Sequence, residues 1–131
     1  MTNRRTPALP APPTPAERPP LERWRAMGDD VAVLNLQIPA DAARGRLFEI
    51  AFSMQVRPLT TAKAPWHAMR VEADGELQWE RRIDTDHPAE YDGLDYRFQR
   101  SVPVGRSLRL RLTVSGHQVR RLKAQIEADE V

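Results

Sequence analysis

Cysteine is absent from the 131-residue chain. Its absence excludes disulfide bonds, thiolate nucleophiles and thiolate metal ligands. No apolar run approaches the roughly 18 residues that a membrane span requires, and the mean hydropathy is −0.60. Arg4 and Arg5 are followed by prolines and not by an apolar segment, so we expect no secretory or twin-arginine signal. Together these absences predict a soluble protein without a membrane span, and we expect it in the cytoplasm.

Recognisable catalytic motifs are also missing. The six glycines are scattered, so there is no glycine-rich phosphate loop, and no serine lies in a Gly-x-Ser-x-Gly sequence. The three histidines, His67, His87 and His117, are far apart in the sequence. An enzyme would need a pocket that brings one of them beside carboxylates. We therefore expect a protein that is not an enzyme and that needs no cofactor.

The chain is long enough for one ordinary domain and too short for two. Seven of its 12 prolines lie in residues 1–20. Such a segment has little to bury and favours extended conformations. The composition predicts a disordered proline-rich arm over residues 1–23 and a single domain over residues 24–131.

Within that domain, apolar residues alternate with polar ones. The alternation is clear in residues 48–56, 94–102 and 108–114, and residues 31–38 are similar. This period of two is typical of strands with one buried and one solvated face. About seven such strands predict an all-β fold, an antiparallel β-sandwich that is immunoglobulin-like in the broad sense. A partly closed barrel is the alternative.

Two hairpins can be placed by register. A three-residue loop at 73–75 would set Val71 opposite Leu77, so that both are buried. A turn at Ser115–Gly116 would set Leu112 opposite Val119, with a β-bulge at 120–121. Residues 117–129 also fit an amphipathic helix, because Val119, Leu122 and Ile126 share one helical face. We favour the strand, and the helix remains the alternative.

Residues 84–95 hold five carboxylates and no cation. Oxygen ligands of this kind suit calcium, and the candidates are Asp84, Asp86, Glu90 and Asp92. The spacing does not fit the helix–loop–helix calcium motif, because Pro88 and Ala89 stand where an oxygen ligand and a glycine are needed. His87 alone does not indicate zinc or iron. We expect a turn-forming, solvated loop, and calcium binding is the alternative.

Residues 97–123 show the opposite bias, with eight cations and no carboxylate. If the 115–116 hairpin forms, five of these cations gather on one sheet face: Arg109, Arg111, Arg120, Arg121 and Lys123. Such a basic face suits an acidic protein partner or another polyanion. Nucleic acid is the weaker expectation, because no aromatic residue alternates with these cations to stack on bases.

Two tryptophans are candidates for partner contact. Trp24 lies where the arm meets the domain, and Trp66 follows a proline at the start of a strand, whereas Trp79 alternates with Leu77 and is expected in the core. We therefore predict a non-catalytic protein-binding or assembly module that uses a basic sheet face and a proline-rich arm. The alternatives are a calcium- or carbohydrate-binding sandwich that uses residues 84–95, and a polyanion- or nucleic-acid-binding domain. The sequence specifies neither the partner nor the oligomeric state.

Overall fold

The structure is a computed structural model that describes residues 19–86 and 91–131. This part of the chain forms eight β-strands and no helix, so it contains no helix that could cross a membrane. The strands are β1 (Arg23–Asp29), β2 (Val33–Ile38), β3 (Arg46–Pro58), β4 (Trp66–Ala73), β5 (Glu76–Asp84), β6 (Asp92–Val102), β7 (Leu108–His117) and β8 (Val119–Glu130).

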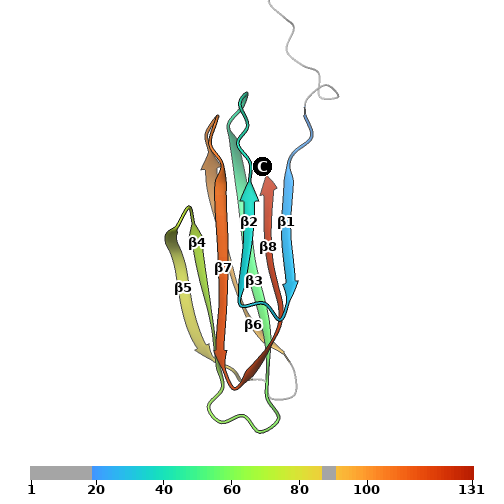
Figure 1. Cartoon of the computed structure of the whole chain (residues 1–131), viewed down its shortest axis with the longest axis vertical. Coiled ribbons are helices and arrows are strands. Elements are labelled where there is room, and N and C mark those ends of the chain that lie inside the picture. Colours follow the sequence, from blue (N-terminus) through green and yellow to red (C-terminus); the bar gives the residue numbers. More distant parts are fainter. Residues whose placement is uncertain (1–18, 87–90) are drawn as a thin grey trace, which may run out of the picture.

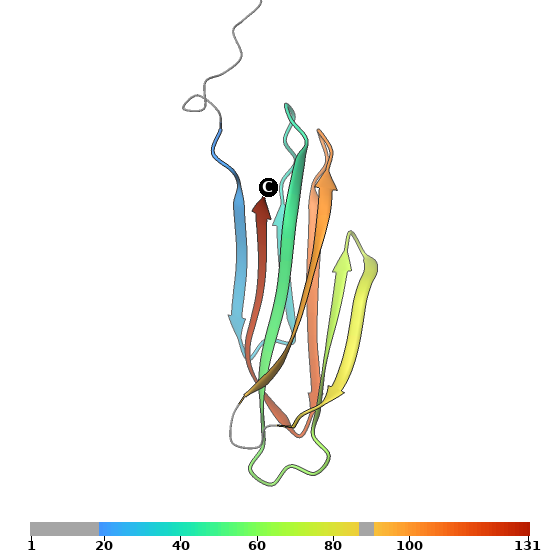
Figure 2. The same cartoon turned by 180° about the vertical axis from the view of Figure 1, so that it is seen from behind.

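The strands form two four-stranded antiparallel sheets (Figures 1 and 2). Sheet A has the order β1-β8-β3-β6, and sheet B has the order β2-β7-β4-β5. Strand β1 pairs with β8, β2 with β7, β3 with β6, and β4 with β5. In this nested pattern the first strand pairs with the last, the second with the seventh, and so on inward, as if one long antiparallel hairpin were folded into two layers. This is the connectivity of an eight-stranded jelly roll. The expected antiparallel β-sandwich is confirmed, and the pairing adds its connectivity.

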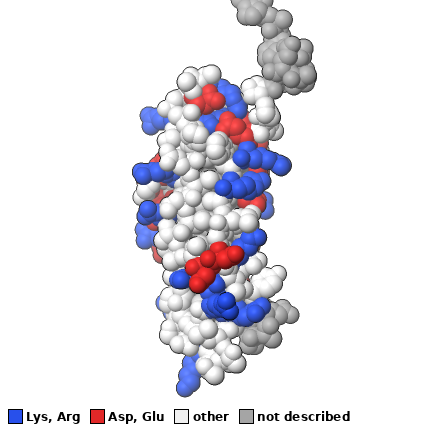
Figure 3. All heavy atoms as spheres, turned by 45° about the vertical axis from the view of Figure 1, so that its right-hand side comes forward, with Lys and Arg blue, Asp and Glu red and all other residues white. Residues whose placement is uncertain are grey.

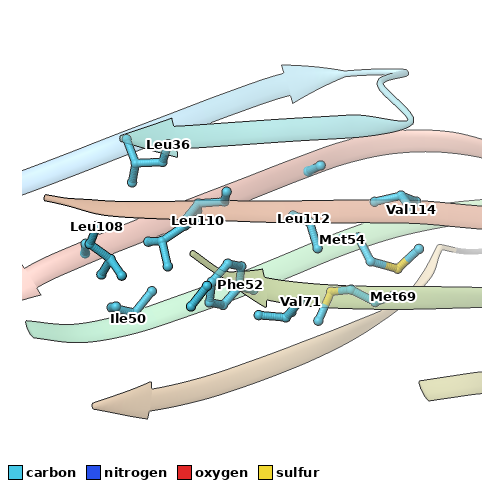
Figure 4. Packing of buried hydrophobic residues seen from close by; sticks show 14 of the residues in the cluster. Leu36, Ile50, Phe52, Met54, Met69, Val71, Leu108, Leu110, Leu112 and Val114 are labelled. Atoms are coloured by element: carbon cyan, nitrogen blue, oxygen red, sulfur yellow. The ribbon is translucent and has the colours of Figure 1, made fainter. Parts of the chain in front are cut away.

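The core lies between the two sheets, where the alternating apolar residues meet. Phe48, Ile50, Phe52 and Met54 of β3 are at most 1% exposed. Ile50, Phe52 and Met54 face Leu108, Leu110 and Leu112 of β7 across the gap (Figure 4). Alternation along the strands therefore identified the buried face correctly, because successive residues of a strand point to opposite sides.

Strand β1 was not expected from the sequence as a strand. Its inward residues, Trp24 and Ala26, pack against the core, while Arg23 and Arg25 face solvent. The strand is short and contains Gly28, so its alternation is weak, and its place is fixed by pairing with β8. Residues 1–18, most of the predicted arm, lie outside the described residues.

The β4–β5 hairpin differs from its prediction. It turns through two residues, Asp74 and Gly75, which both have positive φ (50° and 79°). Such a turn matches the strand twist. Glu72 is therefore opposite Leu77, which is 51% exposed, and a bulge then sets Val71 opposite Trp79. The predicted register was wrong because the bulge restores the alternation one residue later.

The C-terminal segment is a strand, as favoured, and not a helix. The predicted hairpin with β7 was wrong, however, because the two strands belong to different sheets. Gln118, with a φ of 56°, lies at the crossing between them. The bulge lies at 122–123 and not at 120–121, since Met54 pairs with Ala124 and Val56 with Arg121.

A network of ion pairs ties the start of β1 to the rest of the domain. Glu22 accepts hydrogen bonds from Arg46 (2.7 Å) and Arg44 (2.8 Å). Arg44 also donates two hydrogen bonds to Glu130, at 2.5 and 2.9 Å. The Arg46 side chain is only 1% exposed. The network anchors the residue before β1 to the start of β3 and the end of β8.

This network predicts loss of stability in acid. Hydrogen bonds from the Arg44 guanidinium hold the pKa of Glu130 below its ordinary value of 4.5. A carboxyl with a lowered folded-state pKa stabilises the protein above its ordinary pKa, and that stability is lost as the pH falls through the folded value. We expect the free energy of unfolding to fall as the pH drops below 4.5. The slope should be shallower in Glu130→Gln, as urea titrations at stepped pH would show. Equal slopes in both proteins would contradict this.

Candidate functional site

The predicted basic face of five cations is divided between the two sheets. Arg109 and Arg111 lie on β7 in sheet B, whereas Arg120, Arg121 and Lys123 lie on β8 in sheet A. The prediction of one face was wrong because it depended on a β7–β8 hairpin that does not form. In Figure 3, where the β1 side turns toward the reader, acidic and basic side chains are interspersed and form no continuous basic surface.

The three β8 cations are not concentrated on one face. Arg120 is exposed and lies opposite Arg57 of β3. Arg121 is partly buried, and its Nε is 3.3 Å from Oδ1 of Asp30. Lys123 lies at the bulge. They are therefore weaker candidates for one shared contact than the two arginines of β7.

Arg109 and Arg111 occupy the solvent face of sheet B at one end of β7. Arg109 is opposite Gln37, and Arg111 lies between Asn35 on β2 and Glu72 on β4. The Nε of Arg111 donates to Oδ1 of Asn35 at 3.2 Å. Their position follows from the alternation of β7, which buries the leucines between them.

These residues line a hollow of about 450 Å³ on the outer face of sheet B. Leu36, Leu110 and Gly75 of the β4–β5 turn also line it. The polar lining is Asn35, Gln37, Glu72, Arg109 and Arg111. The hollow thus combines two cations and one carboxylate with two amides, and the cations and amides can donate to the carboxylate oxygens of a ligand.

A second hollow, of about 250 Å³, lies beside the same turn. Asp74 lines it together with Arg100 of β6 and Arg106 of the β6–β7 loop. Asp74 also accepts a hydrogen bond from the backbone N–H of Arg109 (2.9 Å), which joins the turn to β7. We call Arg100, Arg106, Arg109 and Arg111 the arginine cluster.

No member of the arginine cluster forms an ion pair with a carboxylate among residues 19–86 and 91–131. The nearest carboxylate on sheet B, Glu72, pairs with Arg70 at 3.2 Å. The described acidic residues of the 84–95 stretch lie at the other end of the sandwich, since β5 runs away from the turn and β6 returns toward it (Figure 1). The cluster is therefore available for an external anion.

Arg100 and Arg106 were missing from the predicted site. The signal for them was present, because both belong to the run of eight cations without a carboxylate. What the sequence did not show is that the β4–β5 turn lies between β7 and the end of β6. Asn35 and Gln37 were missed for the same reason, since only the β2–β7 pairing places them beside the arginines.

The described part of the acidic stretch is mostly strand and not the expected loop, since Asp84 ends β5 and Asp92 and Asp95 lie in β6. Asp92 accepts a hydrogen bond from the N–H of Gly93 at 2.8 Å. Asp84, Asp86 and Asp92 line a shallow hollow together with Arg81 and Arg82. Outside residues 1–18 and 87–90, no group of three metal-ligating side chains comes together. Glu90 lies outside the described residues, and calcium binding stays a prediction.

The two candidate tryptophans have partners within the domain. Trp24 packs against the core, and its Nε1 donates to Glu22 at 3.0 Å. The ring of Trp66 is covered by the guanidinium of Arg82 from β5, at 3.8 Å from its centroid. On the side of β7, the ring of His117 stacks on it at 6.3 Å. Neither indole is an open platform for a base or a sugar.

The histidines are not gathered around a pocket. His67 is completely buried, and its two ring nitrogens lie 2.7 Å from Oγ1 of Thr85 and 3.4 Å from the carbonyl oxygen of Gly93. His117 is exposed beside Trp66. His87 lies outside the described residues. Among the described histidines, His67 is therefore explained by its structural contacts.

Comparison with known proteins gives little further information. No family model and no curated protein matches the chain. A solved structure that does match is the crystal structure of dimeric latent PorU from Porphyromonas gingivalis, at 14% identity and a TM-score of 0.48. The match covers 84% of this chain and 13% of that one. A likeness of this degree carries no argument about function, so the proposals below rest on the residues of this chain.

Proposed function

We propose that the protein is a non-catalytic binding module whose arginine cluster holds an acidic segment of a partner protein. The observation that carries this proposal is that two hollows beside the β4–β5 turn are lined by arginines, Arg109 and Arg111 in one and Arg100 and Arg106 in the other, and that none of the four forms an ion pair with a described carboxylate. Charged side chains that serve only solubility are expected to alternate in sign, as they do on the outer face of sheet A. There Arg25 lies 2.9 Å from Asp129.

The chemistry of the hollow favours a carboxylate ligand. Arginine presents a planar set of donors that matches a carboxylate with two parallel hydrogen bonds. Arg109 and Arg111 are carried on a central strand of sheet B, paired on both sides, so their backbone positions are fixed before a ligand binds. A glutamate- or aspartate-rich segment lying along β7 would meet both guanidinium groups in turn.

Nucleic acid fits less well. Single-stranded binding sites combine cations with aromatic rings on which bases stack. The residues that line the two hollows include no aromatic side chain. The proline-rich arm is proposed as a tether for the same partner, and residues 1–18 lie outside the described part of the chain.

Substituting Arg109→Gln and Arg111→Gln together should weaken binding of a fluorescein-labelled oligoglutamate peptide about tenfold or more, because both cations that face the ligand are lost. Fluorescence anisotropy with the full chain at moderate salt would measure this. The matched control is Arg57→Gln with Arg120→Gln, which removes two neighbouring exposed arginines from sheet A. That pair should change the affinity by less than about twofold.

A DNA oligonucleotide of equal net charge distinguishes the two classes of ligand. The proposal expects the peptide to bind more tightly than the DNA. Equal losses in the two double variants would show that only net charge matters, and they would overturn the assignment of the site. Tighter binding of the DNA would overturn the choice of ligand.

A further inference from the structure

Strand β6 has one unpaired edge. It is the last strand of sheet A and spans 11 residues, Asp92–Val102. Its only strand partner in the described part of the chain is β3. An edge strand of this length presents a row of backbone N–H and C=O groups that a further strand can bind, and soluble proteins usually block such an edge.

The residues of β6 form a palindrome in which the charges are inverted about Tyr96. One residue on either side stand Asp95 and Arg97, and two residues away stand Leu94 and Phe98. Four residues away stand Asp92 and Arg100. Three of the four residues before Tyr96 thus have, at the same distance after it, either the opposite charge or a matching apolar side chain, and the fourth pair is Gly93 with Gln99.

We propose that two copies of this chain pair through their β6 edges, antiparallel and centred on Tyr96. A two-fold axis then sets Tyr96 opposite the Tyr96 of the second copy. Asp95 of each copy meets Arg97 of the other, and Asp92 meets Arg100. The two A sheets become one continuous sheet across the axis. This inference shares Arg100 with the arginine cluster, but it is argued from the β6 edge and does not depend on the proposed function.

The charge pattern selects this register over its neighbours. Residues directly opposite in an antiparallel pair lie on the same face, so the strands can shift only in steps that keep inner and outer faces together. Centring the pair on Arg97 would bring two Arg97 side chains together, and centring it on Asp95 would bring two Asp95 side chains together. Like charges directly opposite destabilise a pair.

The two faces of the proposed pair differ in chemistry. Asp95 and Arg97 lie on the exposed outer face, whereas Tyr96 and Phe98 are half-buried on the inner face. Tyr96 stacks between Trp79 of β5, at 4.9 Å, and Phe98, at 5.8 Å. A second copy would extend this aromatic layer across the axis and bury part of it further, so that the inner face contributes apolar burial while the outer face sets the register.

The ion pairs that Asp95 and Arg97 form within one copy compete only weakly with the proposed contacts between two copies. Arg97 lies 3.6 Å from Glu49, but the two side chains are 72% and 47% exposed. Exposed pairs of this kind contribute little, so Arg97 can turn to a closer partner. Asp95 has no ion pair with any residue in the described ranges. Arg100 belongs also to the arginine cluster, and for that reason the test below leaves it unchanged.

Sedimentation velocity of the full chain, from micromolar to hundreds of micromolar, should show a concentration-dependent dimer. Asp95→Arg or Arg97→Asp alone replaces two attractive contacts with two repulsive ones and should raise the dissociation constant about tenfold or more. The double variant Asp95→Arg with Arg97→Asp should dimerise again, because the charges are exchanged. An equimolar mixture of the two single variants should form a heterodimer, and thermal melts confirm that each variant is folded.

The absence of natural cysteine allows an independent test of the register. Tyr96→Cys would place two cysteines opposite each other at a spacing that permits a disulfide. Gln99→Cys, on the same strand, is opposite Gly93 of the second copy and should not cross-link. A wild-type chain that stays monomeric at hundreds of micromolar would overturn the proposal. A dimer that both charge variants leave intact, or one that cross-links equally through both cysteines, would overturn the β6 pairing.

Discussion

Glu22→Ala is expected to lower the free energy of unfolding by about 3 kcal/mol, a large effect for a residue in the segment predicted to be a disordered arm. The reason is that the Arg46 guanidinium, with its side chain 1% exposed, loses its carboxylate partner and keeps only the carbonyl of Pro39 at 2.8 Å. The Trp24 indole also loses its acceptor. Because Glu22 itself is 21% exposed, we place the effect at the lower end of the range for a broken buried pair. Urea unfolding at neutral pH measures it.

Glu127→Gln is the control for this prediction. Glu127 also pairs with an arginine, Arg25, at 3.7 Å, but both side chains are more than a third exposed. We expect a change below about 0.5 kcal/mol, as for exposed pairs generally. A chain that begins at residue 24 should be destabilised at least as much as Glu22→Ala, since it lacks the same carboxylate. If Glu22→Ala and Glu127→Gln have equal effects, the network does not anchor the first strand.

The second large effect is expected for His67→Ala, at about 2–4 kcal/mol of unfolding free energy. The imidazole is completely buried, so its loss leaves a cavity and removes a partner from the buried Thr85 hydroxyl and from the partly buried Gly93 carbonyl. Its two ring nitrogens lie 2.7 Å from Oγ1 of Thr85 and 3.4 Å from the carbonyl oxygen of Gly93. His67 thus links the end of β5 to the start of β6, on either side of residues 87–90.

Thr85→Val separates the hydrogen bond from the packing. It keeps the shape of the side chain, removes the hydroxyl and should cost about 1–2 kcal/mol, less than His67→Ala. Guanidinium unfolding of both variants measures the two contributions. If His67→Ala is as stable as the wild type, the ring is not a structural bridge, and a different role for this buried histidine would have to be sought.

Alternation of apolar residues was enough to predict most of the fold. Phe48, Ile50 and Phe52 are buried as their period of two requires, because the backbone of a strand sends successive side chains to opposite faces. The same rule placed Arg109 and Arg111 on a solvent face. These statements depend only on local geometry, and so they hold whichever strands become neighbours.

The alternation of residues along each strand did not predict which strands are neighbours in the sheets. A hairpin was predicted at Ser115–Gly116, but β7 continues to His117 and the chain crosses at Gln118 from one sheet to the other. The predicted basic face was lost with that hairpin. Strand β1 has too weak an alternation to be recognised, and its pairing with β8 gives it its place. Turn residues indicate that the chain reverses, but the choice between pairing and crossing depends on which long-range contacts bury the most apolar surface.

The arginine cluster also depends partly on the sequence alone and partly on the tertiary structure. The sequence by itself determined that residues 97–123 carry eight cations without a carboxylate and that the acidic residues precede them. It also determined that the domain is built of strands that each have one buried and one solvated face. Only the tertiary structure decided that β5 and β6 carry the described acidic residues to one end of the sandwich. It also decided that Arg109 and Arg111 line one hollow beside the β4–β5 turn while Arg100 and Arg106 line another. The physical reason is that the sequence sets the order of the charged residues along the chain, whereas two opposite charges neutralise each other only when they lie close together. Which charged residues lie close together is fixed by the pairing and packing of the strands.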